Sequence, residues 1–367
     1  MPRAAIALAV ALLCVLGLPA AAFANQVTYD GGDVLTTSHV YAMAFVAPPS
    51  TAASLAPLPP YVFAPAAPNL ESSIAALDSP DYVGWWTSEY SLPARAQLIA
   101  PPTYAGTFFA VSEYLATAPV VSTTAIDAFF ASSPQVPAYD PNAVYLIFLR
   151  AGQALTSGTA GTQSATDPLC ALHNRTPGPD PVHYAVIPYL SMPGCSFTVP
   201  GVTPDQRLFN RTSLVTDHEL IETITDPQTN GVAWVSLGRA ITELADACES
   251  HPFVPLRYRG FTYAAPSLLS DITGSCTATM PPATATFQQS SAGVVVDLSG
   301  PSGPLAGAIV DVVGASSILF TARTSAAGEV TLPSDAVGAT FFFAGSPTAG
   351  GFFQVIGPAP ARAPLRS

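Results

Sequence analysis

Residues 213–249 read SLVTDHELIETITDPQTNGVAWVSLGRAITELADACE, and here a chain poor in charge gathers a compact set of metal-type ligand residues. His218 and Glu222 are four positions apart, so a helix over 213–225 carries both on one face, with Glu219 beside them. Apolar residues on both flanks predict that this helix is buried. Because buried carboxylates are costly unless they are paired or metal-bound, the pattern indicates a divalent cation.

Glu243 and Asp246 follow in a second apolar-periodic stretch, which we expect to be a later helix. The spacing imitates a zinc-protease site, with Glu222 at the position where H-E-x-x-H has its second His. The predicted zinc ligands are His218, Glu222 and Glu243, with water in the fourth position. Glu219 is the predicted general base, and Asp246 is expected to accept the second imidazole N–H of His218. Two carboxylate ligands also suit calcium or manganese.

A structural interpretation of the same residues stays open. An H-E-x-x-E pattern arises by chance, and the glutamates could form a solvated or purely structural polar cluster. In that case the later E-x-x-D would be an exposed helix face before Cys248. Metal content separates the two interpretations.

Composition excludes several classes of partner. The chain has 367 residues, enough for two domains, and a formal net charge of −12. Its 12 basic residues are all arginine and form no cluster. We therefore expect no binding to nucleic acid or to an anionic membrane surface.

The N-terminal residues are typical of a secretory signal peptide over 1–24. Arg3 supplies the positive charge, an apolar run follows, and Ala22 and Ala24 are the small residues before a cleavage point. No later stretch is apolar for long enough to span a bilayer. The sequence therefore predicts a secreted, extracellular protein without a transmembrane span after cleavage.

After signal removal an even number of cysteines remains, which in an exported chain predicts two disulfides. These cysteines are Cys170, Cys195, Cys248 and Cys276. Local pairing, Cys170 with Cys195 and Cys248 with Cys276, is favoured among the three connectivities. The alternative is a zinc knuckle formed by Cys170-x-x-His173 with Cys195. Asn174 and Asn210 begin glycosylation sequons, which matter only in a eukaryotic host.

Two regions with different sequence patterns follow the signal peptide. Residues 25–280 contain buried-strand patterns at 40–46, 143–149 and 183–189 and helix patterns at 70–77 and 123–130, which predict an α/β or α+β domain. Residues 283–361 contain short β-type runs between Gly, Pro and Ser turns. This second region is predicted to be a small β-sandwich of the immunoglobulin-like or carboxypeptidase-regulatory-like kind.

An ordered set of landmarks over about 27–276 resembles the phosphate-induced protein, or EXORDIUM-like, secreted family. It comprises Tyr29-Asp-Gly-Gly-Asp-Val-Leu35, Val144-Tyr-Leu-Ile147, Cys170-Ala-Leu-His173, Tyr184-Ala-Val-Ile187, His218-Glu-Leu-Ile-Glu222, Thr225-Asp-Pro227 and Glu243-Leu-Ala-Asp246-Ala-Cys248. The resemblance implies an extracellular or cell-wall protein, and the helix within it resembles that of zincin metallopeptidases. Two functions are therefore expected as alternatives. One is a secreted metallopeptidase acting on protein or peptide, and the other is a non-catalytic protein that binds a cell-surface ligand.

Overall fold

The structure is a computed structural model of the chain. It describes residues 27–358 apart from 30, 49–54, 80–81, 83–85, 88–89, 91–96, 98, 134–138, 159–168, 192–194, 196–197, 200, 202, 228–232, 238–240, 271–274, 278–283, 291–292, 301–302, 305–308, 314–317, 333–339 and 347–349. The predicted signal peptide, residues 1–24, lies outside the described residues. Within the part that is described, no helix has the length and apolar character needed to cross a membrane.

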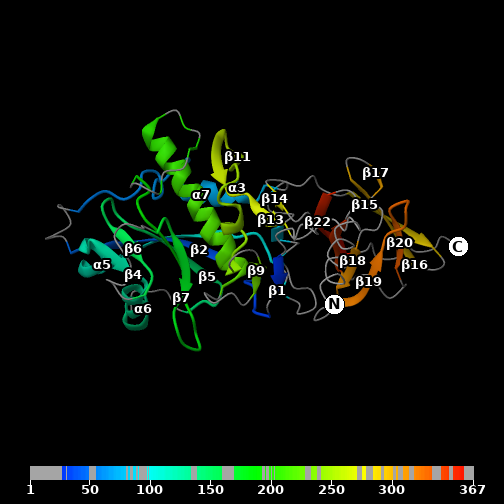
Figure 1. Ribbon diagram of the computed structural model, residues 1–367, viewed down its shortest axis with the longest axis horizontal. Coiled ribbons are helices and arrows are strands. Elements are labelled where there is room, and N and C mark those ends of the chain that lie inside the picture. The colour runs from blue at the N-terminus through cyan, green and yellow to red at the C-terminus, as the bar shows by residue number, and fades with distance from the viewer. Residues whose placement is uncertain are drawn as a thin grey trace, which may run out of the picture.

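A five-stranded sheet forms the centre of the first part of the chain (Figure 1). In spatial order its strands are β3 (Thr103–Val111), β2 (His39–Val46), β5 (Ala143–Phe148), β8 (His183–Ile187) and β7 (Leu172–Arg175). The first four run parallel, and β7 pairs antiparallel with β8 at one edge. The three buried strands expected from the sequence are β2, β5 and β8, and the expected mixture of helices with a mainly parallel sheet is present.

Both faces of this sheet are covered. The helices with described bounds are α3 (Leu70–Leu77), α5 (Glu113–Thr117), α6 (Thr123–Ser132) and α7 (Pro204–Thr225). Alternate residues of β5 face opposite sides, so Leu146 joins the apolar core that contains residues of α3 and α7. Its neighbour Ile147 joins the core that contains residues of α5 and α6. Every residue of β5 and β8 is buried as a result.

Helix α7 lies across the sheet and is longer than the sequence pattern predicted (Figure 1). The predicted start was residue 213, but the helix begins at Pro204. The side chain of Thr203 accepts a hydrogen bond from the backbone N–H of Gln206, and proline in the first turn needs no N–H partner. The helix ends at Thr225, before Asp226-Pro227, where it was expected to end.

The segment after α7 corrects one expectation. Glu243 and Asp246 were expected on a second helix, whereas the segment forms the short strand β10 (Ile241–Thr242) and a single 3₁₀ turn, η2 (Asp246–Cys248). The backbone N–H groups of Ala245 and Asp246 donate to the side chain of Glu222 instead of to helix carbonyls. Strand β10 pairs with β9 (Trp234–Leu237), which in turn pairs with β1 (Val27–Tyr29).

Two small hairpins complete the first part of the chain. The hairpin of β11 (Val254–Tyr258) and β12 (Phe261–Ala265) turns at Arg259 and Gly260, which both have positive φ. It packs against α7, where Ser213 donates a hydrogen bond to the carbonyl of Ala264. The second hairpin pairs β13 (Leu268–Ser270) with β14 (Ser275–Thr277).

The C-terminal part is rich in strands, as expected. One antiparallel sheet contains β15 (Thr284–Ser290), β16 (Gly293–Gly300), β17 (Gly303–Pro304) and β20 (Glu329–Leu332). The other contains β19 (Ile318–Arg323), β18 (Ile309–Val313), β21 (Thr340–Ser346) and β22 (Gly350–Pro358). A mixed α/β region is therefore followed by a β-rich region, which Figure 1 shows at the end of the molecule away from α5 and α6.

Both predicted disulfides are present. Cys170 is bonded to Cys195, and Cys248 is bonded to Cys276. The first bond uses the two sulfurs that the alternative zinc knuckle would need, so that knuckle is wrong. Neither sequon offers a freely exposed asparagine: Asn210 is buried in α7, and Asn174 donates its amide N–H to Tyr184.

Candidate metal centre

The second half of α7 carries three of the predicted site residues. Glu219 and Glu222 are 6 % and 1 % exposed, and His218 is half-buried beside them. The helix is packed between the sheet and the β11–β12 hairpin, and these side chains line a cavity beside it. The i, i+4 spacing of His218 and Glu222 predicted that both lie on one face of the helix, and the structure places them together there.

Glu222 is the most constrained of these residues. Its Oε1 accepts hydrogen bonds from the backbone N–H groups of Ala245 and Asp246, both at 3.0 Å. Its Oε2 lies 3.1 Å from Nε2 of His218 and 3.9 Å from Nδ1 of His173. One oxygen thus anchors the segment after β10, and the other faces two imidazoles.

His173 belongs to the site, although the sequence argument gave it a role only in the zinc knuckle. It lies on β7 opposite Ala185 of β8, on the face of the sheet that α7 covers. Its Nδ1 lies 3.4 Å from Oε2 of Glu219, and its Nε2 lies 3.6 Å from Oε1 of Glu243. Nε2 also donates a hydrogen bond to the backbone carbonyl of Asp226, where α7 ends. The signal available in the sequence was its place in the Cys170-Ala-Leu-His173 landmark.

Asp246 reaches the same nitrogen of His218 that Glu222 faces. Its Oδ1 lies 3.2 Å from Nε2 of His218. Two groups of potential ligands result, each with its donor atoms within 4.8 Å of one another: His218 with Glu222 and Asp246, and His173 with Glu222 and Glu243. The ligand set His218, Glu222 and Glu243 and the orienting role of Asp246 stay predictions.

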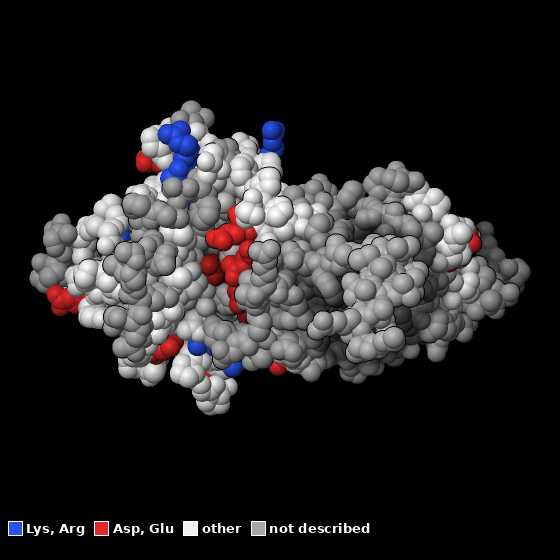
Figure 2. Space-filling model, viewed as in Figure 1, with Lys and Arg blue, Asp and Glu red and all other residues white. Residues whose placement is uncertain are grey.

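All of these side chains line a cavity of about 460 Å³. Its wall also includes the apolar side chains of Leu169, Leu214, Val215 and Phe253. No Lys or Arg occurs among the described residues that line it. Figure 2 shows acidic side chains gathered near the centre of this face of the molecule, around the second half of α7. The cavity wall therefore combines acidic side chains with apolar ones.

Without a metal ion, the histidines and carboxylates of the site shift one another's pKa values. Burial alone would lower the pKa of His173, but Glu243 and Glu219 outweigh it and raise this pKa to about 10. Burial also disfavours the charged form of His218, yet Glu222 and Asp246 raise its pKa well above the usual range. The hydrogen bond from His218 lowers the pKa of Asp246. Both imidazoles thus hold protons where a cation would otherwise sit.

Glu243 shows the cost of crowding carboxylates. Burial raises its pKa to about 8, against the opposing effect of His173, and a hydrogen bond with Glu222 adds to the rise. The carboxyl group of Glu243 therefore holds its proton to a higher pH than an exposed glutamate does.

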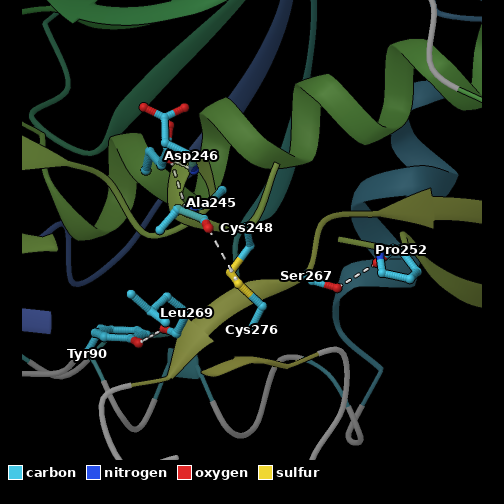
Figure 3. Close-up of a disulfide and its surroundings, with 10 residues drawn as sticks. Tyr90, Ala245, Asp246, Cys248, Pro252, Ser267, Leu269 and Cys276 are labelled. Atoms are coloured by element: carbon cyan, nitrogen blue, oxygen red, sulfur yellow. Dashed lines mark hydrogen bonds between the residues drawn. A yellow bond between two sulfur atoms is a disulfide. The ribbon is translucent and has the colours of Figure 1, made fainter. Parts of the chain in front are cut away.

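The disulfides border the cavity. Cys248 lines the cavity, and its disulfide with Cys276 ties η2 to β14. In Figure 3 the carboxylate of Asp246 points away from this disulfide. His251 lies near both sulfurs, but a disulfide sulfur is not a thiolate ligand, so these three residues form no metal site. Cys170, which forms the other disulfide with Cys195, lies three residues before His173.

Comparison with known proteins adds no relative: no protein-family model matches the chain, and neither does any curated protein or solved structure. The functional argument therefore rests on the site alone.

Proposed function

We propose that this chain is a secreted, zincin-like metal-dependent hydrolase, a metallopeptidase whose cavity binds zinc. The supporting observation is the convergence of two histidines and four carboxylates on one cavity whose described lining has no Lys or Arg. Buried carboxylates are costly unless a Lys, an Arg or a metal ion compensates them, and neither Lys nor Arg is among the described residues of the wall.

The distances around His218 support a metal site. Ligands of tetrahedral zinc lie about 2.0–2.2 Å from the ion, so neighbouring donor atoms are separated by about 3.3–3.6 Å. The carboxylate oxygens of Glu222 and Asp246 lie 3.1 and 3.2 Å from Nε2 of His218. A shift of a few tenths of an ångström would give zinc-type separations.

The chain's own residues have distinct roles in this proposal. A bound divalent cation supplies Lewis acidity, which polarises a carbonyl and lowers the pKa of water. Glu219 takes the proton of the attacking water and passes it to the leaving amine. It lies against the cavity and, unlike Glu222, belongs to neither group of potential ligands. Two backbone N–H groups hold the buried side chain of Glu222 in one place.

The remaining features fit an extracellular protease. Two disulfides suit an oxidising compartment, and the ordered landmarks support membership of the EXORDIUM-like family. The apolar wall formed by Leu169, Leu214, Val215 and Phe253 offers a place for an apolar side chain of a peptide. The two C-terminal sheets are proposed to pack as a sandwich that takes no part in the chemistry.

Metal analysis of the purified full chain, followed by a peptide-library cleavage assay with and without chelator, tests the proposal. Bound metal and chelator-sensitive cleavage are expected. Absence of stoichiometric metal after loading with zinc, manganese or calcium would overturn it. Bound metal with no cleavage of any peptide would leave a structural metal in a protein that binds a surface ligand.

A further inference from the structure

We propose that the cavity holds two divalent cations, with the carboxylate of Glu222 shared between them. This inference rests on the proposed function, which itself requires only one ion. It would make the protein a two-metal hydrolase, in which paired ions stabilise the attacking and leaving atoms together.

The first basis is the division of the ligands. His218 and Asp246 form one group of potential ligands with Glu222, and His173 and Glu243 form another with the same glutamate. Each pair supplies one imidazole and one carboxylate, and each completes its three-residue group by using Glu222. A single ion with the four ligands of a zinc site would leave some of these donors without a metal.

The second basis is the way Glu222 is held. Backbone N–H groups of Ala245 and Asp246 occupy Oε1, so Oε2 is the oxygen that both histidines face. Oε2 lies 3.1 Å from Nε2 of His218 and 3.9 Å from Nδ1 of His173. An oxygen fixed between two imidazoles is placed to bridge two ions, whose usual separation in paired sites is about 3.5–4 Å.

The third basis is charge. Glu219, Glu222, Glu243 and Asp246 contribute four negative charges when ionised, and neither Lys nor Arg lies among the described residues of the cavity wall. One divalent cation would neutralise two of the four carboxylates, whereas two cations would neutralise all four. Glu219 and Glu222 are buried and Glu243 is partly buried, so a second ion would reduce the repulsion among these neighbouring carboxylates.

The test is the stoichiometry of the full, disulfide-bonded chain. Equilibrium dialysis against zinc or manganese, followed by elemental analysis, should give two ions per chain. In the manganese form, electron paramagnetic resonance should show exchange coupling between the ions, in place of the hyperfine pattern of an isolated ion. One ion per chain at saturation would overturn the inference and leave the proposed function standing. No bound ion would overturn both.

Matched variants assign the ions. Asp246→Asn and Glu243→Gln each remove one ligand from one group, and both side chains reach the surface, so folding should survive. Each variant should bind one ion and lose the exchange coupling. Glu249→Gln alters an exposed acid of the same cavity wall outside both groups and should keep two ions. Two ions retained in both ligand variants, or both lost in Glu249→Gln, would overturn the assignment.

Discussion

Oε2 of Glu222 lies 3.1 Å from Nε2 of His218, one helical turn earlier on α7, while its Oε1 holds the backbone of the segment that follows β10. One carboxylate thus joins the helix to the loop that carries Asp246. Because Glu222 is buried, its effect on metal binding and its effect on folding are coupled, and two substitutions can separate them.

Glu222→Ala should abolish metal binding and lower the stability of the metal-free protein. It removes the acceptor of two backbone N–H groups, and each charge-assisted hydrogen bond contributes about 1.5–3 kcal/mol. Glu222→Gln keeps a carbonyl acceptor, so it should lose metal affinity with a smaller loss of stability. Urea unfolding in chelator, together with metal analysis, measures both. Equal destabilisation by Ala and Gln would show that the backbone contacts contribute little.

The metal-free protein should lose stability as pH rises from about 4.5 to about 10. The folded pKa of His173 is raised to about 10, so its stabilising contribution is complete below about 6.5 and is lost as pH rises through 10. Glu243, whose pKa is raised to about 8, changes stability in the same direction, because the folded state binds its proton more tightly. Melting temperatures in chelator check this, with Glu243→Gln as the variant expected to flatten the profile.

Metal affinity should have the opposite pH dependence, since ligands must lose protons before they bind an ion. A metal-free stability that rises with pH over this range would contradict the protonated histidine cluster.

Local patterns predicted most of the main sheet and the helices around it. The apolar run at 143–149 gave β5 within one residue, because a strand covered on both faces is apolar throughout. The spacing of His218 and Glu222 placed both on the cavity flank for an equally local reason. In contrast, the start of α7 at Pro204 depends on a cap, Thr203, that lies ten positions before the predicted start, in a stretch with little apolar periodicity.

The missing parts of the site depend on contacts between distant residues. His173 and Glu219 are 46 positions apart and meet only because β7 pairs with β8 beneath α7. The segment around Asp246 has helical periodicity but forms strand β10 and one 3₁₀ turn. The side chain of Glu222 accepts hydrogen bonds from its backbone, and the Cys248–Cys276 bond ties it to β14. Tertiary contacts of this kind override a weak local preference for helix.

Replacing Cys248 and Cys276 together by serine should lower the free energy of unfolding by about 3–4 kcal/mol, the value expected for closing a loop of this length. Because the bond also fixes η2, we expect weaker metal binding by the group that contains Asp246. The matched control is the double replacement of Cys170 and Cys195, which closes a loop of similar length on the side of His173. Chemical unfolding and metal titration of both variants check this, and unchanged metal affinity in both would show that neither bond positions ligands.

His173→Gln should lower metal affinity by at least ~10-fold, since its ring faces Glu219, Glu222 and Glu243. His251→Gln provides the control, because His251 is exposed on the same cavity wall but contacts the disulfide side of it. Competition with a metal-binding dye measures both affinities. Equal effects of the two substitutions would place His173 outside the metal centre.

Glu219→Gln should separate catalysis from metal binding. Gln has the same shape but cannot take a proton, and Glu219 belongs to neither group of potential ligands. We therefore expect the variant to retain its metal and its fold, while peptide hydrolysis falls by at least ~100-fold, the usual effect of losing a general base. Elemental analysis and steady-state kinetics on one preparation measure both quantities, with Glu249→Gln as the control that changes charge in the same cavity. Because Glu219 also lies 3.4 Å from Nδ1 of His173, its removal should lower the pKa of that imidazole in the metal-free protein, which NMR titration can follow. Full hydrolytic activity in Glu219→Gln would assign the proton transfer to another residue, whereas loss of metal would make Glu219 a ligand.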